Sequence, residues 1–187
     1  MKKIAVFLYV FAGVFLILCV SIYIFIHKSA TDYNFEILSS AIGSDVRIVF
    51  DDMAVPHIYA ESETDAMFAL GYVHASERLW QMDLLRRAGG GELSELLGAD
   101  MIENDRYLRT LGMRDAAIKD AAEFENTSSE KTKSAALAYL AGLNTFIGEE
   151  NHPVEYLLLG ATPQEFTTVD MYKVAGFMAY SFAIHIK

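Results

Sequence analysis

Residues Asp65 to Arg87 read DAMFALGYVHASERLWQMDLLRR, and their apolar positions recur at the spacing of an α-helix. Ser62 lies just before this stretch, and the acidic residue Asp65 follows it by three positions. This spacing is typical of a helix start. Gly89-Gly90-Gly91 is expected to end the helix, because glycine favours turns over helix interiors. The apolar positions that follow the helical spacing are Ala66, Ala69, Leu70, Val73, Trp80 and Leu84.

Upstream of this helix, the pattern changes to that of a β-hairpin. Residues 46–50 (VRIVF) alternate with a period of two, residues 51–54 (DDMA) interrupt them, and residues 55–60 (VPHIYA) resume an extended pattern. Pro56 lacks a backbone N–H, so it suits the start or edge of a strand.

Downstream of the glycine triplet, the sequence is helical almost throughout. The fold class we predict is α+β, mainly α, with the hairpin at its N-terminal side. The final apolar stretch is apolar on every side, which predicts burial in something larger than itself. The four expected helices run over Glu92–Leu97, about Asp105–Phe124, about Ser129–Ile147, and Val169–Ile184.

The N-terminus predicts a membrane segment. Ile4 to Ile26 are 23 residues without a charge, long enough as a helix to span the roughly 30 Å hydrocarbon core of a bilayer. We interpret residues 1–28 as an uncleaved signal-anchor, residues 29–44 as a linker that leads to the first strand, and residues 45–187 as the domain that follows. A cleaved signal peptide is the alternative, but Lys28 lies where a cut after Ala30 would need a small residue.

Charge and cysteine content narrow the location and partners. Lys2 and Lys3 place the N-terminus in the cytoplasm, so the following domain is expected outside it, on a single-pass membrane protein. The 159 residues after Lys28 hold 12 basic and 25 acidic residues, which excludes nucleic acid as an expected partner. Cys19 is the only cysteine and follows Leu18, which disfavours a lipoprotein site and rules out an intramolecular disulfide.

Motifs for metal, nucleotide or serine-hydrolase chemistry are absent from the sequence. The glycine triplet could offer N–H groups to an anion, although a plain corner is the simpler interpretation. Asp51-Asp52 and Glu103-Asn104-Asp105 carry oxygen ligands of the type calcium takes, although clustered acids are usually solvated turns.

Five further side chains have both a functional and a structural interpretation. His57 and His74 could act as general bases, but hydrogen-bonded structural histidines are the expected identity. The arginines at 78, 86 and 87 share a helix with Glu77 and Asp83, so we expect internal ion pairs rather than substrate binding.

Three ordered segments carry a resemblance to a known family: VPHIYA at 55–60, the quoted stretch at 65–87, and ELSELLG at 92–98. Together they strongly resemble the start of the penicillin acylase (penicillin amidase) family over about residues 45–182. Ala54 departs from the pattern where a turn glycine is usual, which puts a tight turn in doubt. Ser76-Glu77 replace Gln-Asp, and Phe166 replaces Trp. Positions that match the family include Tyr72, Ala75, Arg78, Leu79, Gln81, Met82, Asp105, Arg109, Tyr139, Gly142, Asn144, Pro153, Glu155, Tyr156 and residues 163–170.

The resemblance implies an N-terminal nucleophile hydrolase with an αββα core. In that family a precursor is cut into an α chain and a β chain, and the N-terminal serine of the β chain is the nucleophile, with its own α-amino group as base. This sequence corresponds to most of an α chain. We therefore expect no catalytic residue in it and a β chain as its partner.

The resemblance also implies where substrate would bind. The late helix of the family's α chain lines the acyl pocket, and the matching positions here are Met178, Ser181 and Phe182. The structural alternative is that these three are core residues of a buried helix. The family's calcium takes one carboxylate from just beyond this helix, so we expect no metal ligand or cofactor in this chain and calcium only in the complete enzyme.

Three hypotheses on function follow. The first is the α portion of a membrane-anchored amide hydrolase acting on penicillins, N-acyl homoserine lactones or related acyl amides. The second is a truncated, non-catalytic remnant of such an enzyme. The third is an unrelated anchored helical interaction module. The DNA downstream of Lys187 separates the first two, because a reading frame for a serine-led β chain supports the first.

Overall fold

The computed structural model describes residues 2–29, 42–149 and 152–185, and the chain divides into two compact units, Met1–Asp32 and Tyr33–Lys187. The first unit contains helix α1 (Lys2–Ser29). Its segment Phe7–Phe25, 19 residues long, is apolar and long enough to cross a membrane. This property is shared by uncleaved anchors and cleaved signal sequences, so it fits both interpretations of the N-terminus.

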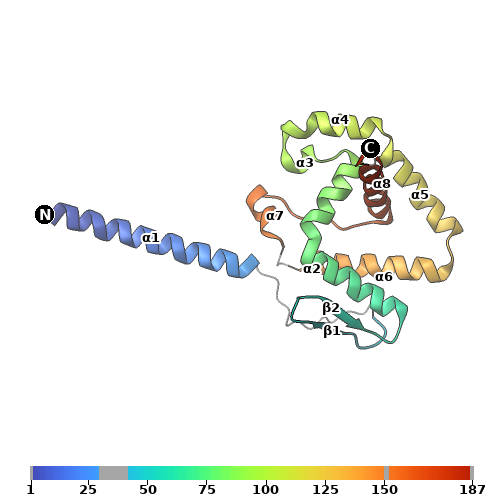
Figure 1. The fold of residues 1–187 in the computed structure, drawn as a ribbon, viewed down its shortest axis with the longest axis horizontal. Helices are drawn as coiled ribbons and strands as arrows, with labels where there is room; N and C mark the ends of the chain where they lie inside the picture. The colour runs from blue at the N-terminus through green and yellow to red at the C-terminus, as the bar shows by residue number, and fades with distance from the viewer. Residues whose placement is uncertain (1, 30–41, 150–151, 186–187) are drawn as a thin grey trace. The chain divides into compact units, whose positions relative to one another are not determined.

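The second unit is a β-hairpin followed by helices, which confirms the predicted mainly α, α+β class (Figure 1). The hairpin pairs its strands antiparallel, with Ile48 opposite Ile58 and Phe50 opposite Pro56. The elements of this unit are β1 (Arg47–Phe50), β2 (Pro56–Tyr59), α2 (Glu63–Gly90), α3 (Ser94–Leu97), the 3-10 helix η1 (Ala99–Met101), α4 (Ile102–Thr110), α5 (Met113–Thr127), α6 (Glu130–Ile147), α7 (Val154–Leu159) and α8 (Thr168–His185).

The hairpin turn forms although alanine stands at the usual glycine position. Ala54 adopts a left-handed conformation with φ of 58°. The carboxylate of Asp51 compensates by accepting the backbone N–H groups of Met53 and Val55, each at 2.9 Å. The side chain of Asp51 thus stabilises the turn, in which Ala54 adopts a strained conformation.

Helix α2 begins as predicted, with the Ser62 hydroxyl accepting the N–H of Asp65 at 3.0 Å. Its end differs from the prediction, because Gly89 and Gly90 are still helical and only Gly91, at φ 63°, leaves the helix. The Gly91 N–H donates a hydrogen bond to the Ala88 carbonyl, and the Glu92 N–H donates one to the Arg87 carbonyl. These two bonds make a Schellman motif, which uses the N–H groups at this corner.

The segment expected to be one helix over Asp105–Phe124 is two helices, α4 and α5. Gly112 separates them with φ of 70°. Glycine adopts this conformation readily because it has no Cβ that would clash with the backbone. The short helix α7, between Pro153 and Gly160, was not predicted from the sequence.

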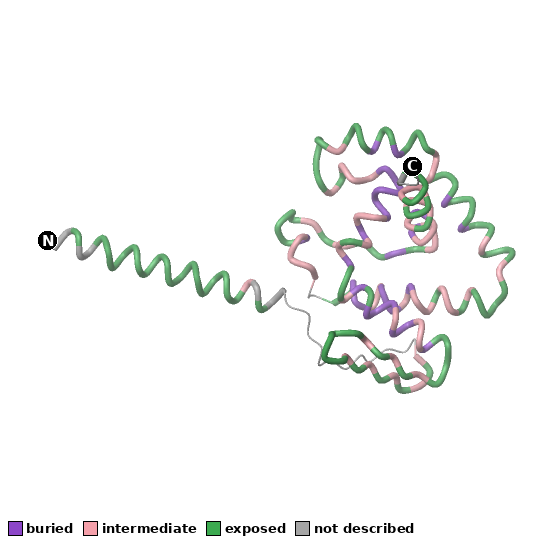
Figure 2. Tube along the Cα trace, in the orientation of Figure 1, coloured by how far each residue is buried: buried purple, intermediate pink, exposed green. Residues whose placement is uncertain are grey.

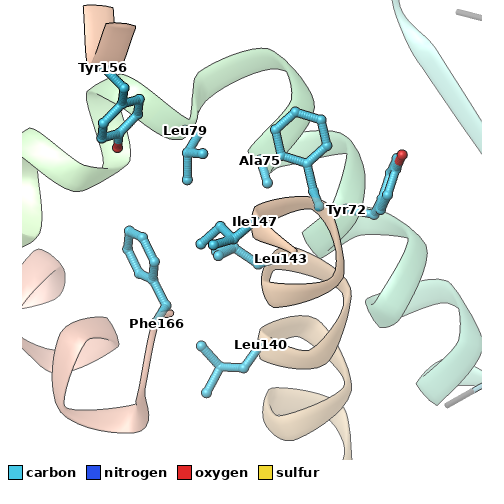
Figure 3. Packing of buried hydrophobic residues seen from close by; sticks show 9 residues of the cluster. Tyr72, Ala75, Leu79, Leu140, Leu143, Ile147, Tyr156 and Phe166 are labelled. Atoms are coloured by element: carbon cyan, nitrogen blue, oxygen red, sulfur yellow. The ribbon is translucent and has the colours of Figure 1, made fainter. Parts of the chain in front are cut away.

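The core lies where α2 crosses α6. Two glycines bring their backbones together: a Cβ on Gly71 would lie 2.0 Å from the Tyr139 carbonyl oxygen, and one on Gly142 only 1.8 Å from that of Phe68. Figure 2 shows burial concentrated along α2 and the part of α6 that meets it. The buried cluster in Figure 3 consists of Tyr72, Ala75, Leu79, Leu140, Leu143, Phe146, Ile147, Tyr156 and Phe166.

Candidate functional site

The three residues predicted to line an acyl pocket all lie on the second half of α8. The side chains of Met178 and Phe182 are four residues apart, so they share one helix face, and they are 42% and 65% exposed. Ser181 is half-buried, and its hydroxyl donates to the Met178 carbonyl at 2.8 Å. Within this chain, Met178 and Phe182 are therefore surface residues, and their place in a pocket stays a prediction.

The start of α8, in contrast, is held by several hydrogen bonds around the buried side chain of Asp170. The N–H and the hydroxyl of Thr167 both donate hydrogen bonds to Asp170 Oδ2, at 2.9 and 2.7 Å. The Asp170 N–H in turn donates to the Thr167 hydroxyl oxygen. This is a capping box. Burial by itself raises the pKa of Asp170, but the bonds from Thr167 and the charges of Lys173 and Arg86 together lower it below its usual value.

A buried polar cluster connects α2 to α7 and α8. At its centre Asp83, fully buried, accepts from Arg86 Nε at 2.6 Å, from Arg87 Nε at 3.1 Å, and from the Tyr156 hydroxyl at 2.9 Å. Burial and the neighbouring Asp83 carboxylate raise the pKa of Tyr156, so its hydroxyl stays protonated and donates. The ion pairs predicted for Arg86 and Arg87 with Asp83 are thus confirmed.

Arg86 extends this cluster to the segment that precedes α8. Its two terminal nitrogens donate to the carbonyls of Gln164 and Glu165, each at 2.9 Å, and its guanidinium lies 3.9 Å from the centre of the Phe166 ring. Asn144 of α6 holds the same segment by a pair of hydrogen bonds to the Phe166 backbone, at 2.8 and 2.9 Å. The entry to α8 is therefore fixed from two helices.

A second ion pair joins α8 to the end of α2. Lys173 Nζ lies 3.1 Å from Glu92 Oε2 and 3.2 Å from Asp170 Oδ1, and all three side chains are at most 15% exposed. Nearby, a Cβ on Gly89 would lie 2.3 Å from the Lys173 carbonyl oxygen, so the two helices touch through their backbones.

An apolar groove of about 180 Å³ lies between α5, α6 and α8. Met171 and Ala175 in its wall share the α8 face on which Met178 and Phe182 follow, because the spacing is four, three and four residues. Pockets for whole small-molecule ligands measure about 300 to 1,000 Å³, so this groove is too small to be one by itself. Its lining residues are Phe124, Ala136, Thr168, Met171, Tyr172 and Ala175.

The two histidines considered as general bases are both hydrogen-bonded, as expected of structural histidines. His57 Nε2 lies 3.3 Å from Asp51 Oδ2, and His74 Nδ1 lies 3.1 Å from the Tyr139 hydroxyl. Partial burial lowers the pKa of His74. Arg78 is exposed and forms no ion pair with Glu77 or with any other described residue, so that predicted pair is wrong.

Helix α3, just after the glycine triplet, does receive an anion, but an internal one. The Asp105 carboxylate accepts the N–H groups of Leu93 and Ser94 at 2.8 and 2.7 Å. Burial works to raise the pKa of Asp105, and these hydrogen bonds outweigh it, so the pKa is lowered. The N–H groups that follow the glycine triplet are therefore already paired with the carboxylate of Asp105, which was considered above as a possible calcium ligand.

The residues that the structure describes provide no set of ligands for calcium. No three His, Cys, Asp or Glu side chains gather there in a way that could hold a metal ion. Asp51 is likewise engaged, by the two N–H groups of the hairpin turn and by His57. These residues therefore do not fit a calcium site.

The residues that sequence reasoning missed are those that hold α8, namely Glu92, Asp170 and Lys173. One signal was available, since Thr167 to Asp170 has the T-x-x-D spacing of a capping box before an apolar run. A lysine inside an otherwise apolar helix is a second signal, because buried lysines need a partner.

Comparison with known proteins places this arrangement in a family. The penicillin amidase family profile matches residues 45–187. Penicillin acylase 2 proenzyme from Pseudomonas sp. (strain SE83) is 43% identical over 124 residues, which cover 66% of this chain and 16% of that protein. Acyl-homoserine lactone acylase QuiP from Pseudomonas syringae pv. tomato is 28% identical over 148 residues, covering 78% of this chain and 18% of that protein.

The fold is similar to that of a solved relative as well. Thermostable penicillin G acylase from Alcaligenes faecalis superposes with a TM-score of 0.64 at 25% identity, covering 75% of each chain. The chain spans about a sixth of the length of the curated relatives it matches. The profile match over most of the chain and the shared fold show that the chain belongs to the penicillin amidase family.

Proposed function

We propose that this chain is the α portion of a membrane-anchored hydrolase that cleaves acyl amides together with a β chain. The observation that carries the proposal is the contrast within α8. Its first turns are fixed by buried ion pairs, whereas Met178 and Phe182 farther along are exposed apolar side chains. A rigid helix that presents apolar side chains suits one wall of a site for an apolar acyl group.

The substrate class follows from what the relatives have in common. One is named a penicillin acylase and another an acyl-homoserine lactone acylase. Penicillins and acyl-homoserine lactones both carry an acyl group on an amide nitrogen. We therefore assign penicillins, N-acyl homoserine lactones or related acyl amides as substrates, with Met178, Ser181 and Phe182 against the acyl group.

The catalytic groups in this proposal belong to the partner. A β chain with an N-terminal serine supplies the hydroxyl nucleophile, and the α-amino group of that serine takes its proton. An α-amine has a pKa near 8, about two units below that of lysine, so a useful fraction is unprotonated at neutral pH. This chain contributes no catalytic residue and no metal ligand, and calcium is assigned only to the complete enzyme.

The proposed location is the cell membrane, with α1 as a single-pass anchor and the helical unit outside the cytoplasm. Mass spectrometry of the chain from membrane fractions tests the anchor, and a mass that includes residues 1–28 is the expected result. A mature N-terminus near Thr31 would instead identify the segment as a cleaved signal peptide.

The activity test compares the chain alone with the chain co-expressed with the β chain of the Pseudomonas sp. relative. Phenylacetylated and long-chain acylated chromogenic amides serve as substrates. The chain alone is expected to show no turnover above a buffer blank, because the covalent step needs the serine. The two-chain protein is expected to hydrolyse at least one substrate class.

Site-directed variants then test the acyl-group assignment. Phe182→Ala should change the ratio of kcat/KM for the two substrate classes by about tenfold, as expected when an apolar pocket loses a large side chain. Leu157→Ala is the matched control, because Leu157 is also an exposed apolar residue, 70% accessible, but lies on α7. Equal ratios in Phe182→Ala and the parent would show that Phe182 does not touch the acyl group.

A further inference from the structure

Helix α8 meets the end of α2 at a contact that leaves room for no side chain. A methyl group on Gly89 would come within 2.3 Å of the Lys173 carbonyl oxygen and 2.8 Å of its carbonyl carbon. Ordinary contacts begin near 3.4 Å, so a side chain at Gly89 would force α8 away by about 1 Å. The glycine therefore sets the separation of the two helices.

The Lys173 side chain fixes a second coordinate, the rotation of α8 about its own axis. Its ammonium group reaches across to Glu92 Oε2 at 3.1 Å, and both side chains are largely buried. Glu92 is itself held in place, since its N–H closes the Schellman motif at the end of α2. Turning α8 would separate these buried charges, which is strongly unfavourable.

The locked part of α8 and the predicted pocket residues belong to one continuous helix. Met178 and Phe182 follow Lys173 by five and nine residues, which is about 7.5 and 13.5 Å along the axis. The intervening residues contain no proline. A displacement of α8 at Lys173 is therefore transmitted to Met178 and Phe182, and the hydroxyls of Tyr180 and Tyr107, 2.8 Å apart, form a further attachment to α4.

We propose that Gly89, Glu92 and Lys173 are positioning residues that determine acyl-group preference by fixing where α8 presents Met178 and Phe182. This inference rests on the function proposed above. None of the three residues touches the substrate in this proposal. Their effect is large because misplacing a contact group by about 1 Å can change a rate by about a hundredfold.

The first test measures the position of α8 without using activity. In the full chain carrying Cys19→Ser, spin labels are attached through Glu77→Cys on α2 and Ala179→Cys on α8, both exposed positions. Electron–electron resonance then gives the distance between the labels. Gly89→Ala and Lys173→Met should each shift the mean distance by about 1 Å or more, as expected when packed helices are forced apart or lose a buried pair.

Two controls keep this measurement decisive. Gly176→Ala, also on α8, should leave the distance unchanged, because nothing lies within 4 Å of a methyl group there. Lys173→Arg keeps the charge and should bring the distance back toward that of the parent. If Gly89→Ala does not fold, the Lys173 pair of variants decides, and an unchanged distance in Lys173→Met overturns the proposal.

The second test asks whether the position of α8 sets preference in the two-chain enzyme. Gly89→Ala and Lys173→Met should change the long-chain to phenylacetyl ratio of kcat/KM by about tenfold, mainly through KM, and Lys173→Arg should restore it. A shifted distance with an unchanged ratio overturns the link to specificity. If the parent two-chain protein hydrolyses no amide, the proposed function fails, whereas the label distances still decide whether these residues position α8.

Discussion

Ala54 is the residue at which the local conformation and the amino acid disagree most. Its φ of 58° is unfavourable for alanine by about 1 to 2 kcal/mol. Glycine would relieve this strain, but it would also increase the conformational entropy of the unfolded chain, which offsets part of the gain in stability. Ala54→Gly should therefore raise the free energy of unfolding by about 0.5 to 1 kcal/mol. Urea unfolding followed by circular dichroism measures this.

Met53→Gly is the control for that change, since Met53 is 83% exposed and lies outside the left-handed region. It should bring no gain in stability. A gain of equal size in both variants would mean that glycine acts on the unfolded chain or the turn in general, and not on strain at position 54.

Asp170 makes part of the stability of α8 dependent on pH. Its pKa in the folded chain is below the ordinary 3.8, so its contribution is fully present above that value and is lost as the pH falls through the lower, folded pKa. Asp170→Asn should therefore lower the free energy of unfolding by about 2 kcal/mol at pH 7, where hydrogen bonds to a charge are lost. Below about pH 4 the difference from the parent should shrink.

Urea titrations at several pH values check this convergence. Asp52→Asn is a suitable control, because Asp52 is exposed and forms no ion pair with another described residue. The control should match the parent at every pH. A difference for Asp170→Asn that stays constant from pH 7 to pH 3 would show that the charge of Asp170 is not the cause.

At the scale of elements, the crossing of α2 and α6 depends on the absence of a side chain at Gly142. Gly142→Ala would place a methyl group 1.8 Å from the Phe68 carbonyl oxygen, in backbone that cannot move without separating the helices. Overpacking of this kind costs about 3 kcal/mol. Thermal and urea unfolding should both show the loss.

Gly148→Ala provides the comparison, as its nearest neighbour, the Thr145 carbonyl oxygen, is 3.4 Å away and its φ is negative. Alanine there should be nearly neutral. If Gly142→Ala were as well tolerated as Gly148→Ala, the two helices would not be in the close contact described.

Elements with a local signal could be predicted from the sequence. Ser62 and Asp65 mark the start of α2, and Ser129 caps α6 through the N–H of Thr132. The break at Gly112 was missed, because a single glycine inside a helical pattern is often tolerated. Helix α7 was missed too, since six residues between Pro153 and Gly160 are too few to show a period.

The candidate site differs in what could be inferred from the sequence. Met178, Ser181 and Phe182 were assigned to an acyl pocket through the family resemblance, and that assignment stays a prediction, whereas the partner of Lys173 could not be identified from the sequence. Lys173 and Glu92 are 81 residues apart, and nothing local links them. Pairings of this kind depend on how α2 and α8 pack, which is a property of the folded chain rather than of any segment.

At the scale of the whole molecule, the second half of α8 is the surface that we expect a partner to cover. Its exposed apolar residues include Met178, Phe182 and Ile184, and Ile184 is 50% accessible. Residues 29–187, purified without a β chain, should therefore bind a hydrophobic dye or self-associate, because exposed apolar patches mark interaction sites. Dye fluorescence and light scattering measure this.

Met178→Ser combined with Phe182→Ser should reduce the dye signal, and co-expression with a β chain should reduce it as well. Exposed leucines on α7 provide the control, as Leu157→Ser removes a comparable side chain elsewhere. A monomeric chain that binds no dye would contradict the need for a partner at α8.

The long-range bonding of α2 also has a consequence for biosynthesis. Arg86 binds the carbonyl of Glu165, which lies 79 residues later in the chain. At about 5 to 20 residues per second, α2 leaves the ribosome roughly 4 to 16 s before these partners exist. During that interval the charged side chains of Asp83, Arg86 and Arg87 remain hydrated. The same charges that are buried in the folded chain therefore keep the newly made helix soluble at first.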